Sequence, residues 1–449
     1  MSQQIEEYVR GLGLDAYVVG GAVRDELLGI ESKDADFLVL GVDHEGLRAL
    51  LEPHGRVEDL EVAGQRVGLR LRPRDRAIRE LAPAGIEFAP PRREASTGPG
   101  RHDFEIVVDP SASVQDDLER RDFTVNAMAR RLSDGELVDP FGGQEDLEDR
   151  VLRTVSPRSL SEDPLRVLRG LRLVSQFDLA PDDETARQLV EEGESVKLVS
   201  AERIGGGLQA DGMGELSKLL LGSRPAKALR LARDTGVLLA IIPEFAPAIG
   251  YGADNVRQGG PVDEHTFSVV ANTPRSLPVR LAALLHDLGK PHVRVEEHAA
   301  EGARIADRVL ERLRYPTRVR RYVVDLIAAH AFFTDDVGEL FARRFLREHG
   351  EQLARDLVAH KEADLRAKKD VDANEIARTL RLGELIDQEA SQPHLLRDLA
   401  VDGADLIELG YHEGPALGAT LDELLDLVVD DPSRNEREWL LSHAKEGLA

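Results

Sequence analysis

The chain has 449 residues, a formal net charge of −25 and no cysteine. This length is too great for one hydrophobic core and predicts three or four domains. The lack of cysteine excludes disulfides and thiolate metal sites, so histidines and carboxylates are the metal ligands to expect. The apolar runs are too short to cross a membrane, and the acidic start MSQQIEEY does not resemble a signal peptide. These features predict a cytoplasmic protein without a membrane partner.

The negative charge argues against a nucleic-acid partner, and no DNA partner is expected. Arginines are nevertheless concentrated in two stretches. Nine of them fall between Arg66 and Arg101, and a second basic stretch runs from Arg304 to Arg321. Such local basic faces would suit a weak contact with RNA. Two other interpretations stay open: arginine replaces lysine as in a GC-rich genome, and the acidity reflects a salt-tolerant host.

The first 150 residues combine strand and helix patterns. Residues 14–20 alternate and are rich in valine, which predicts a strand. Gly20 and Gly21 then turn the chain into a helix that ends at Gly29. Further strands are predicted at 34–41, 66–73, 85–89 and, as the last of them, 104–109, with a Gly/Pro/Ser loop at 94–102. The pattern predicts a mixed α/β head domain over residues 1–150.

From Asp163 onward the strand patterns nearly vanish and helical periodicity dominates. Glycine-rich breaks at 205–214 and 249–261 interrupt this helical part. The expected fold class is therefore an α/β head with a mixed sheet, followed by all-α domains. The expected divisions of the helical part are a neck at 151–222, a third domain at 223–375 and a tail at 376–449.

Two carboxylates on one predicted strand form the first candidate site. Asp34 and Asp36 are two residues apart, so both side chains point to the same face. Paired carboxylates bind Mg²⁺, and a two-metal site can activate an attacking hydroxyl and stabilise a leaving pyrophosphate. Glu87, on a strand that could lie alongside, is the candidate third carboxylate. The alternative for each of these residues is an exposed position without a ligand.

The turn at Gly20 and Gly21 is a candidate phosphate site. Glycine lets the backbone approach phosphate, the following helix presents its N–H groups, and Arg24 lies one turn further on. The segment DLERRDFTVNA, residues 117–127, then combines charged and polar side chains with few apolar ones. Each pattern is common by itself. Together, and in this order, the Gly20–Gly21 turn, the pair Asp34 and Asp36, and residues 117–127 predict a site for a nucleoside triphosphate and its magnesium ions.

Three motifs, GGAVRDELLG, KDADF and DLERRDFTVNAMA, resemble signature motifs of the class II tRNA nucleotidyltransferase and poly(A) polymerase family. The loop at 91–106 resembles the flexible loop of the bacterial subgroup that carries an HD domain, and residues 401–441 resemble the C-terminal segment of the same family. The resemblance implies that Asp34 and Asp36 bind metal. It also implies contacts with the sugar and phosphates of the nucleotide from Arg121, Asp122 and Asn126.

The segment EDPLRVLRGLR, residues 162–172, resembles the nucleotide-selecting motif of that family. Four of its residues recur every three positions and so lie close on one helical side: Asp163, Arg166, Arg169 and Arg172. A carboxylate beside a guanidinium matches the amino group and ring nitrogen that cytosine and adenine share, whereas guanine and uracil present a carbonyl there. Asp163 and Arg166 would thus select C and A without a template, while Arg169 and Arg172 hold phosphates or brace the pair. The alternative is an exposed, salt-bridged helix face.

One departure from the family follows this motif. Glu202 and Arg203 begin an E-R-x-x-x-E-like pattern, but glycines come next and the pattern resumes only at Glu215. This indicates a short insertion within residues 205–214. It puts in question how rigidly the neck is coupled to the selecting helix.

A second candidate site lies in the third domain. His286 and Asp287 belong to an apolar helical run, on the polar side of the expected helix. Neutral imidazoles with a carboxylate suit a divalent transition metal or Mg²⁺, which could lower the pKa of a bound water for phosphoester hydrolysis. The region resembles an HD-superfamily phosphohydrolase domain, with His265, His286, Asp287 and Asp364 at its metal positions. His298 and His330 are either auxiliary ligands or solvated helix residues.

The resemblance implies a CTP/ATP:tRNA nucleotidyltransferase that builds or repairs the 3′-terminal CCA of tRNA without a template. Its partners would be the tRNA 3′ end, CTP and ATP, and its cofactor Mg²⁺, with a transition metal as a further candidate in the HD domain. That domain would hydrolyse phosphoesters such as a 2′,3′-cyclic phosphate. Poly(A) polymerase and partial CC or A addition are alternatives within this chemistry. An HD phosphohydrolase whose head only binds nucleotide or RNA is the alternative of another class, and the oligomeric state is open.

Overall fold

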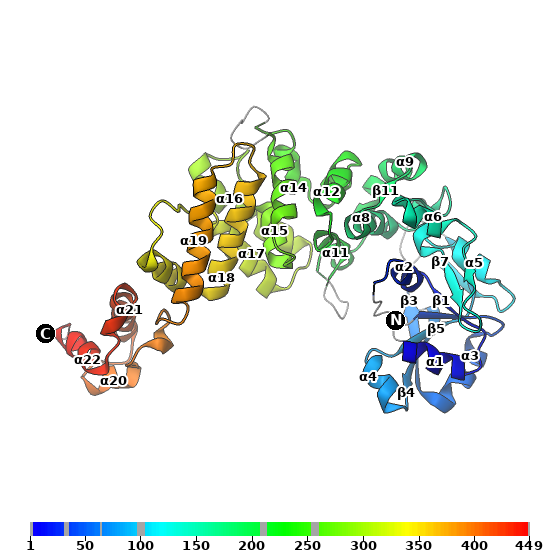
Figure 1. Cartoon of the computed structure of the whole chain (residues 1–449), viewed down its shortest axis with the longest axis horizontal. Helices are drawn as coiled ribbons and strands as arrows, with labels where there is room; N and C mark the ends of the chain where they lie inside the picture. The colour runs from blue at the N-terminus through cyan, green and yellow to red at the C-terminus, as the bar shows by residue number, and fades with distance from the viewer. Residues whose placement is uncertain are drawn as a thin grey trace. The chain divides into compact units, whose positions relative to one another are not determined.

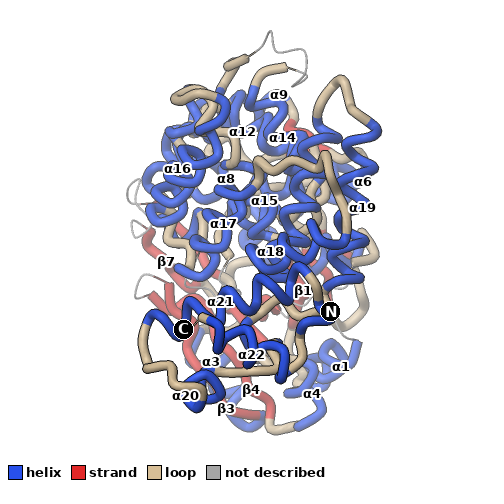
Figure 2. Tube along the Cα trace, turned by 90° about the vertical axis from the view of Figure 1, so that its left-hand side faces the viewer, coloured by secondary structure: helices blue, strands red, loops and turns tan. Residues whose placement is uncertain are grey.

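The computed structural model describes residues 3–30, 36–62, 65–96, 104–206, 213–252 and 260–447. Asp34 and most of the predicted glycine-rich insertion lie outside these residues. The chain divides into two compact units, Met1–Pro243 and Glu244–Ala449 (Figure 1). The described strands all belong to the first unit, and the described part of the second is helical (Figure 2). The expected fold class is thereby confirmed, while the division into four domains stays a prediction.

A seven-stranded mixed sheet forms the centre of the head, in the order β3-β4-β5-β2-β1-β8-β9. Its strands are β1 (Ala16–Val19), β2 (Asp36–Val39), β3 (Gly55–Val62), β4 (Gln65–Pro73), β5 (Ile86–Ala89), β8 (Ala129–Arg131) and β9 (Leu137–Val138). Strands β2 and β5 pair in parallel, with Asp36 opposite Glu87. The expectation that the strand of Glu87 lies alongside that of Asp36 is therefore confirmed.

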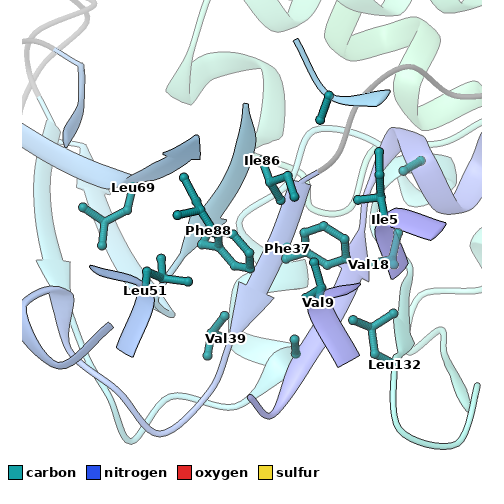
Figure 3. Packing of buried hydrophobic residues seen from close by; sticks show 14 of the residues in the cluster. Ile5, Val9, Val18, Phe37, Val39, Leu51, Leu69, Ile86, Phe88 and Leu132 are labelled. Atoms are coloured by element: carbon teal, nitrogen blue, oxygen red, sulfur yellow. The ribbon is translucent and has the colours of Figure 1, made fainter. Parts of the chain in front are cut away.

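An apolar cluster packs one face of this sheet against α1 (Gln3–Gly11), α3 (His44–Leu51) and α4 (Arg76–Leu81). The rings of Phe37 and Phe88 stack at its centre with their centroids 5.5 Å apart (Figure 3). Successive side chains of a strand point to opposite faces. Because Phe37 and Phe88 face this cluster, Asp36 and Glu87 project from the opposite face of the sheet. The pleat of two strands therefore decides where the carboxylates lie.

The helix after β1 and the helical segments in and around residues 117–127 are short. They are α2 (Gly21–Leu27), α5 (Val114–Glu119), the 3-10 turn η2 (Thr124–Asn126) and α6 (Gly143–Glu148). Residues 117–127 thus do not form one continuous helix, since the chain turns between α5 and η2. A small apolar cluster that includes Leu118 and Ala127 anchors this segment to Leu38 of β2.

The predicted head strands are confirmed, with described ends displaced by no more than two residues. Strand β7 (Phe104–Val108) pairs with β6 (Arg92–Ser96) in a separate two-stranded sheet. The prediction that it is the last strand of the head is wrong, because β8 and β9 follow it. These two strands have three and two residues, too few to produce an alternating pattern.

Helices and one short strand pair, β10 (Val151–Leu152) with β11 (Ala180–Pro181), complete the first unit. The helices are α7 (Ser159–Glu162), α8 (Leu165–Phe177), α9 (Asp183–Glu191), α10 (Ala201–Ile204), α11 (Glu215–Leu220), α12 (Pro225–Asp234) and α13 (Val237–Ile241). Helix α8 packs against α11 and α12. Gly222 permits a close approach there, because a Cβ at this position would lie 2.0 Å from Oγ of Ser175.

The second unit contains a compact helical group and a smaller C-terminal cluster. The longer helices are α14 (Val262–Asn272), α15 (Leu277–Leu285), α16 (His298–Arg312), α17 (Thr317–Ala329), α18 (Glu339–Ala367) and α19 (Ala373–Glu389). The C-terminal helices are α20 (Gly403–Glu408), α21 (Pro415–Asp430) and α22 (Arg437–Glu446). Helix α18 packs against α14 and α19, and α16 packs against α17. Among the helices that the structure describes, none has the length and apolar character needed to cross a membrane.

Candidate active site

A cavity of about 590 Å³ lies in the first unit, on the side of the sheet where Asp36 and Glu87 project. It is lined by the sheet, by the motif of residues 117–126 and by the selecting segment that leads into α8. The predicted site residues in its lining are Gly21, Arg24, Asp36, Glu87, Arg121, Asp122, Asn126, Asp163, Arg166, Arg169 and Arg172. The fold therefore brings together residues from four sequence motifs, which extend from Gly21 to Arg172. Asp34 lies outside the described residues, so its position relative to this cavity stays a prediction.

Glu87 is held by an arginine from the neighbouring strand. Strands β4 and β5 are antiparallel with Arg70 opposite Glu87, and Arg70 donates to Oε1 of Glu87 at 2.5 and 3.2 Å. This ion pair orients the carboxylate beside Asp36. Carboxylate oxygens are the ligands that Mg²⁺ prefers, so Asp36 and Glu87 are a chemically suitable donor set for it. Sequence reasoning missed Arg70 because the partner strand supplies it.

Arg24 and Arg121, two of the arginines predicted to bind phosphate, are both held by neighbouring side chains. Arg24 is buried and donates to Oδ1 of Asn126 at 2.5 Å and to Oδ1 of Asp25 at 2.6 and 2.9 Å. Arg121 donates to Oδ2 of Asp117 at 3.0 Å. Guanidinium groups held in this way are positive and preorganised at the cavity wall, which suits the binding of an anion.

Gly20 serves a purpose that the sequence pattern did not reveal. Its φ is 73°, in the left-handed region that favours glycine. A Cβ at this position would also lie 2.4 Å from Nη1 of Arg121. Gly20 therefore gives the guanidinium of Arg121 the space to lie against the turn after β1.

Asp117 orders the arginines of its own motif, a role that the sequence analysis did not assign. Its carboxylate is buried and accepts hydrogen bonds from Arg120 and Arg121, three and four residues further on. Burial by itself would raise the pKa of Asp117, but the two guanidinium groups outweigh it and lower the pKa to about 2. The spacing of acid and arginines in the sequence is the signal that could have identified this contact.

We expect this ion pair to make the stability of the first unit depend on pH in the acid range. The folded pKa of Asp117 is depressed from 3.8 to about 2, so its contribution is complete above about pH 4 and is lost as the pH falls through 2. The shift corresponds to about 2 kcal/mol. Asp117→Asn should remove this part of the pH dependence, measured by urea unfolding between pH 2 and 7. An unchanged slope between parent and variant would contradict it.

The selecting segment differs in one respect from the sequence-based expectation. Oδ1 of Asp163 accepts a hydrogen bond from the backbone N–H of Leu165 at 2.9 Å and so caps the start of α8. Arg166 donates to the carbonyl oxygens of Ser159 and Arg120 at 2.9 and 2.7 Å. Arg166 therefore links the selecting segment to residues 117–127 of the head. It does not form a simple ion pair with Asp163. Both side chains still line the cavity.

Arg169 and Arg172 brace the cavity through acidic partners. Nε of Arg169 lies 3.1 Å from Oδ2 of Asp122. Burial would raise the pKa of Asp122, but Arg169 and the hydrogen bond from Asn126 hold it below its usual value. Arg172 lies 3.2 Å from Oε2 of Glu215, the residue at which the interrupted E-R-x-x-x-E-like pattern resumes. A direct contact thus couples α11 to the selecting helix, whatever the predicted insertion does.

The second unit gathers histidines and aspartates in one cluster, which we call the HD cluster: His265, His286, Asp287, His298, His330, His360 and Asp364, all of them buried except the half-buried Asp364. Nε2 of His265 lies 2.9 Å from Oδ1 of Asp364, and Nε2 of His286 lies 3.2 Å from Oδ2 of Asp287. The fold therefore brings the four predicted ligands together from α14, α18 and the end of α15. Apart from the adjacent His286 and Asp287, these residues are far apart in the sequence but close together in the folded chain.

Two expectations about this cluster need correction. His286 and Asp287 are each 1% exposed and directly follow α15, so they do not lie on a polar helix side. His298 and His330 are also buried, which excludes the reading that they are solvated helix residues. His360 is a member that the sequence analysis missed, although it precedes Asp364 by one helical turn on α18.

The donor set of the HD cluster fits a divalent cation. Nε2 of His286 is buried and lies 3.2 Å from Oδ2 of Asp287, so an imidazole nitrogen and a carboxylate oxygen face each other inside the protein. Burial would raise the pKa of Asp287, but His286 and Lys290 hold it well below its usual value, so the carboxylate is ionised. Imidazole nitrogens combined with carboxylate oxygens suit transition metals such as zinc, nickel or cobalt.

Family models match the regions of the chain that contain the two candidate sites. Residues 16–153 match the family model of the poly(A) polymerase head domain, residues 178–249 match a probable RNA- and SrmB-binding site of polymerase A, and residues 262–369 match the HD domain. Both kinds of catalytic domain generally use divalent metal ions.

Similar proteins cover nearly the whole chain. The multifunctional CCA protein of Xanthomonas campestris pv. campestris is 32% identical over 431 residues, which are 90% of this chain and 95% of that protein. The corresponding protein of Alkalilimnicola ehrlichii is 36% identical over 324 residues, 68% of this chain and 71% of the relative. Among solved structures, the Bacillus stearothermophilus CCA-adding enzyme in complex with CTP has a TM-score of 0.69 and 25% identity, covering 99% of this chain and 96% of its own. The chain belongs to the multifunctional CCA protein family, nucleotidyltransferases that combine a poly(A) polymerase head with an HD domain.

Proposed function

We propose that the head transfers CMP and AMP from CTP and ATP to the 3′ end of tRNA and so builds or repairs its terminal CCA. The observation that best supports this proposal is that one cavity is lined by Asp36, Glu87, the motif of residues 117–126 and the selecting segment. The solved relatives include an enzyme in complex with CTP and a Thermotoga maritima CCA-adding enzyme complexed with tRNA, which support this choice of substrates.

The side chains of the cavity divide into metal and phosphate ligands. Asp34, Asp36 and Glu87 would hold Mg²⁺, which when bound promotes attack by the tRNA 3′-hydroxyl and departure of pyrophosphate. Arg24 and Arg121 bind the triphosphate beside the turn at Gly20 and Gly21. Asp122 and Asn126, which are hydrogen-bonded to each other at 3.0 Å, position the sugar.

Base selection is assigned to the start of α8. The carboxylate of Asp163 accepts from the amino group that cytosine and adenine share, and the guanidinium of Arg166 donates to the adjacent ring nitrogen. Backbone carbonyls hold Arg166 in place, and Arg169 and Arg172 hold the surrounding acids. A preorganised pair of this kind selects a base without a template strand.

Extension of a tRNA transcript that lacks its 3′ CCA tests this function. CTP, ATP, UTP and GTP are supplied singly, and then CTP together with ATP, and the products are sized. We expect an addition of three nucleotides that needs CTP first and ATP afterwards. A long ladder with ATP alone would indicate a poly(A) polymerase, and addition that stops after CC or A would indicate a partial enzyme. No extension with Mg²⁺ would leave the head as a binding module.

A second activity is supported by the HD cluster. We propose that His265, His286, Asp287 and Asp364 hold a divalent metal that lowers the pKa of a bound water for phosphoester hydrolysis, with a 2′,3′-cyclic phosphate at a tRNA end as the candidate substrate. Asp287→Ala should lower metal-dependent hydrolysis of 2′,3′-cyclic AMP at least about 100-fold. Asp336→Ala, which changes an exposed aspartate of the same unit, is the matched control. Equal activity of Asp287→Ala and the parent would exclude this cluster as the hydrolytic site.

A further inference from the structure

We propose that Phe177 is a positioning residue for the triphosphate of the bound nucleotide. Its ring supports the guanidinium of Arg24 and so connects the phosphate site to the helix that selects the base. The proposal rests on the proposed nucleotidyl-transfer function, because Arg24 is assigned there to the triphosphate. Phe177 does not itself line the head cavity and therefore acts through Arg24.

Arg24 and Phe177 form a cation–π contact. Cζ of Arg24 lies over the ring of Phe177, 4.3 Å from the ring centroid. A guanidinium at this distance is attracted by the negative face of the ring, and the attraction is stronger where water is excluded. Arg24 is 8% exposed, so its charge is largely shielded from water. The ring therefore offsets part of the cost of burying that charge.

The ring supports Arg24 without occupying its hydrogen-bond donors. Arg24 donates through Nη1 to Asn126 and through Nε and Nη2 to Asp25. These contacts use one N–H group on each nitrogen, which leaves a second N–H on both terminal nitrogens. A Cβ at Gly21 would lie 3.3 Å from Nη2, so the guanidinium lies against the start of α2. Because Arg24 lines the head cavity, its remaining N–H groups are available to phosphate oxygens beside this turn.

Arg24 and Phe177 lie on different sides of the cavity wall. Arg24 lines the head cavity, whereas Phe177 lines a second cavity of about 410 Å³ together with Leu28 and Ile30 at the end of α2. The residue that would touch phosphate is thus distinct from the residue that supports it. Substitutions at Phe177 can therefore change the support of Arg24 without removing a group from the nucleotide site.

The backbone around Phe177 is held by contacts from both the head and the neck. Phe177 is the last residue of α8, and its carbonyl oxygen accepts from Nη1 of Arg150 at 2.8 Å. Asp178 follows with a φ of 59°, and its Oδ1 accepts from Nζ of Lys227 in α12 at 2.9 Å. A ring on a backbone fixed in this way gives the guanidinium a constant position.

One helix consequently reaches both functional parts of the cavity. Helix α8 has 13 residues and a length of about 20 Å. Arg166, in its first turn, is assigned to the base, and Phe177, at its end, supports the arginine assigned to the triphosphate. Since CTP and ATP carry the same triphosphate, the support from Phe177 should strengthen the binding of both nucleotides equally.

Nucleotide binding by the full-length protein tests the proposal, with CTP and inorganic triphosphate as probes. Titration calorimetry with Mg²⁺ gives the Kd of each probe for the parent and for Phe177→Leu, which keeps an apolar side chain without a ring. We expect both Kd values to rise by the same factor, about 3- to 10-fold. The Kd of CMP, which lacks the β- and γ-phosphates, should not change. Phe177→Tyr keeps the ring and should match the parent.

A double-mutant cycle distinguishes this contact from a general effect on packing. Arg24→Gln removes the cation, so Phe177→Leu should cause no further loss of triphosphate binding in that background. Phe333→Leu makes the same change at a phenylalanine of the second unit that is 80% exposed, and it should bind both probes like the parent. If Phe177→Leu does not fold, Phe177→Met provides the same comparison with another apolar side chain that has no ring.

Four results would overturn the inference. One is an unchanged Kd for CTP and triphosphate in the variant without the ring, and another is a loss that extends equally to CMP. The third is a loss that persists in the Arg24→Gln background, and the fourth is a parent that binds no triphosphate. Addition of CCA is scored separately by tRNA extension. A parent that makes poly(A) would therefore refute the proposed product while the binding data still decide the role of Phe177.

Discussion

Asp36→Asn should reduce nucleotide addition to tRNA at least about 1000-fold, which corresponds to about 4 kcal/mol of transition-state stabilisation. Asp36 lies opposite Glu87 in the parallel pair β2–β5 and lines the head cavity. Asparagine keeps the shape of the side chain but removes the negative charge that a magnesium ion needs. The substitution therefore tests the charge with little change in packing. Single-turnover extension of a tRNA lacking CCA, with CTP and Mg²⁺, measures the effect.

The control for this experiment is Asp183→Asn, which makes the same change at an exposed position at the start of α9. It should extend tRNA at the rate of the parent. Filter binding of the tRNA should give similar affinities for the parent and both variants, because the loss concerns catalysis. If Asp36→Asn retains more than about a tenth of the parent rate, Asp36 is not a metal ligand of the reaction.

Asp163→Asn should change which base is added. The parent carboxylate can only accept, so a carbonyl of uracil is repelled, whereas an asparagine amide can donate to that carbonyl. We expect the ratio of kcat/KM for CTP over UTP to fall between about 10- and 100-fold, the effect of one charged hydrogen bond. Asparagine can still cap α8 through Oδ1 to Leu165, which keeps the local fold. Primer extension with each nucleotide singly gives the ratio.

A matched variant separates base selection from helix capping. Asp182 caps α9 by accepting from the backbone N–H of Thr185, and it does not line the cavity. Asp182→Asn should leave the CTP/UTP ratio unchanged. If Asp163→Asn lowers kcat/KM for both nucleotides equally, Asp163 acts only as a cap, and the selecting group must be sought among the other lining residues.

Local sequence patterns predicted the elements that carry the head site. Residue patterns identified β1, β2, β4 and β5, each with four or more residues, whereas the eight-residue β3 was not predicted. The motifs and their resemblance to a known family also led to half of the residues that line the cavity. The contacts that hold those residues were not predictable in the same way. Arg70 reaches Glu87 through strand pairing, and Glu215 reaches Arg172 across two packed helices.

In the HD cluster, too, the sequence predicted the residues but not their surroundings. The order of histidines and aspartates in the sequence predicted a metal site, but it placed His286 and Asp287 on a polar helix side and left His298 and His330 undecided. Burial depends on which helices pack around a residue, and that information is distributed over α14 to α18. The facing nitrogens of His298 and His330 come from two different helix ends.

The sequence by itself determined the family, the fold class and the kinds of side chain available for chemistry, because motifs, periodicity and composition are local properties of the chain. Tertiary structure alone decided which oxygens and nitrogens face one another. The parallel register placed Asp36 beside Glu87, the close approach at Gly20 made room for Arg121, and helix packing buried the histidines. Distances between groups far apart in the chain are set by packing as a whole, so no local pattern contains them.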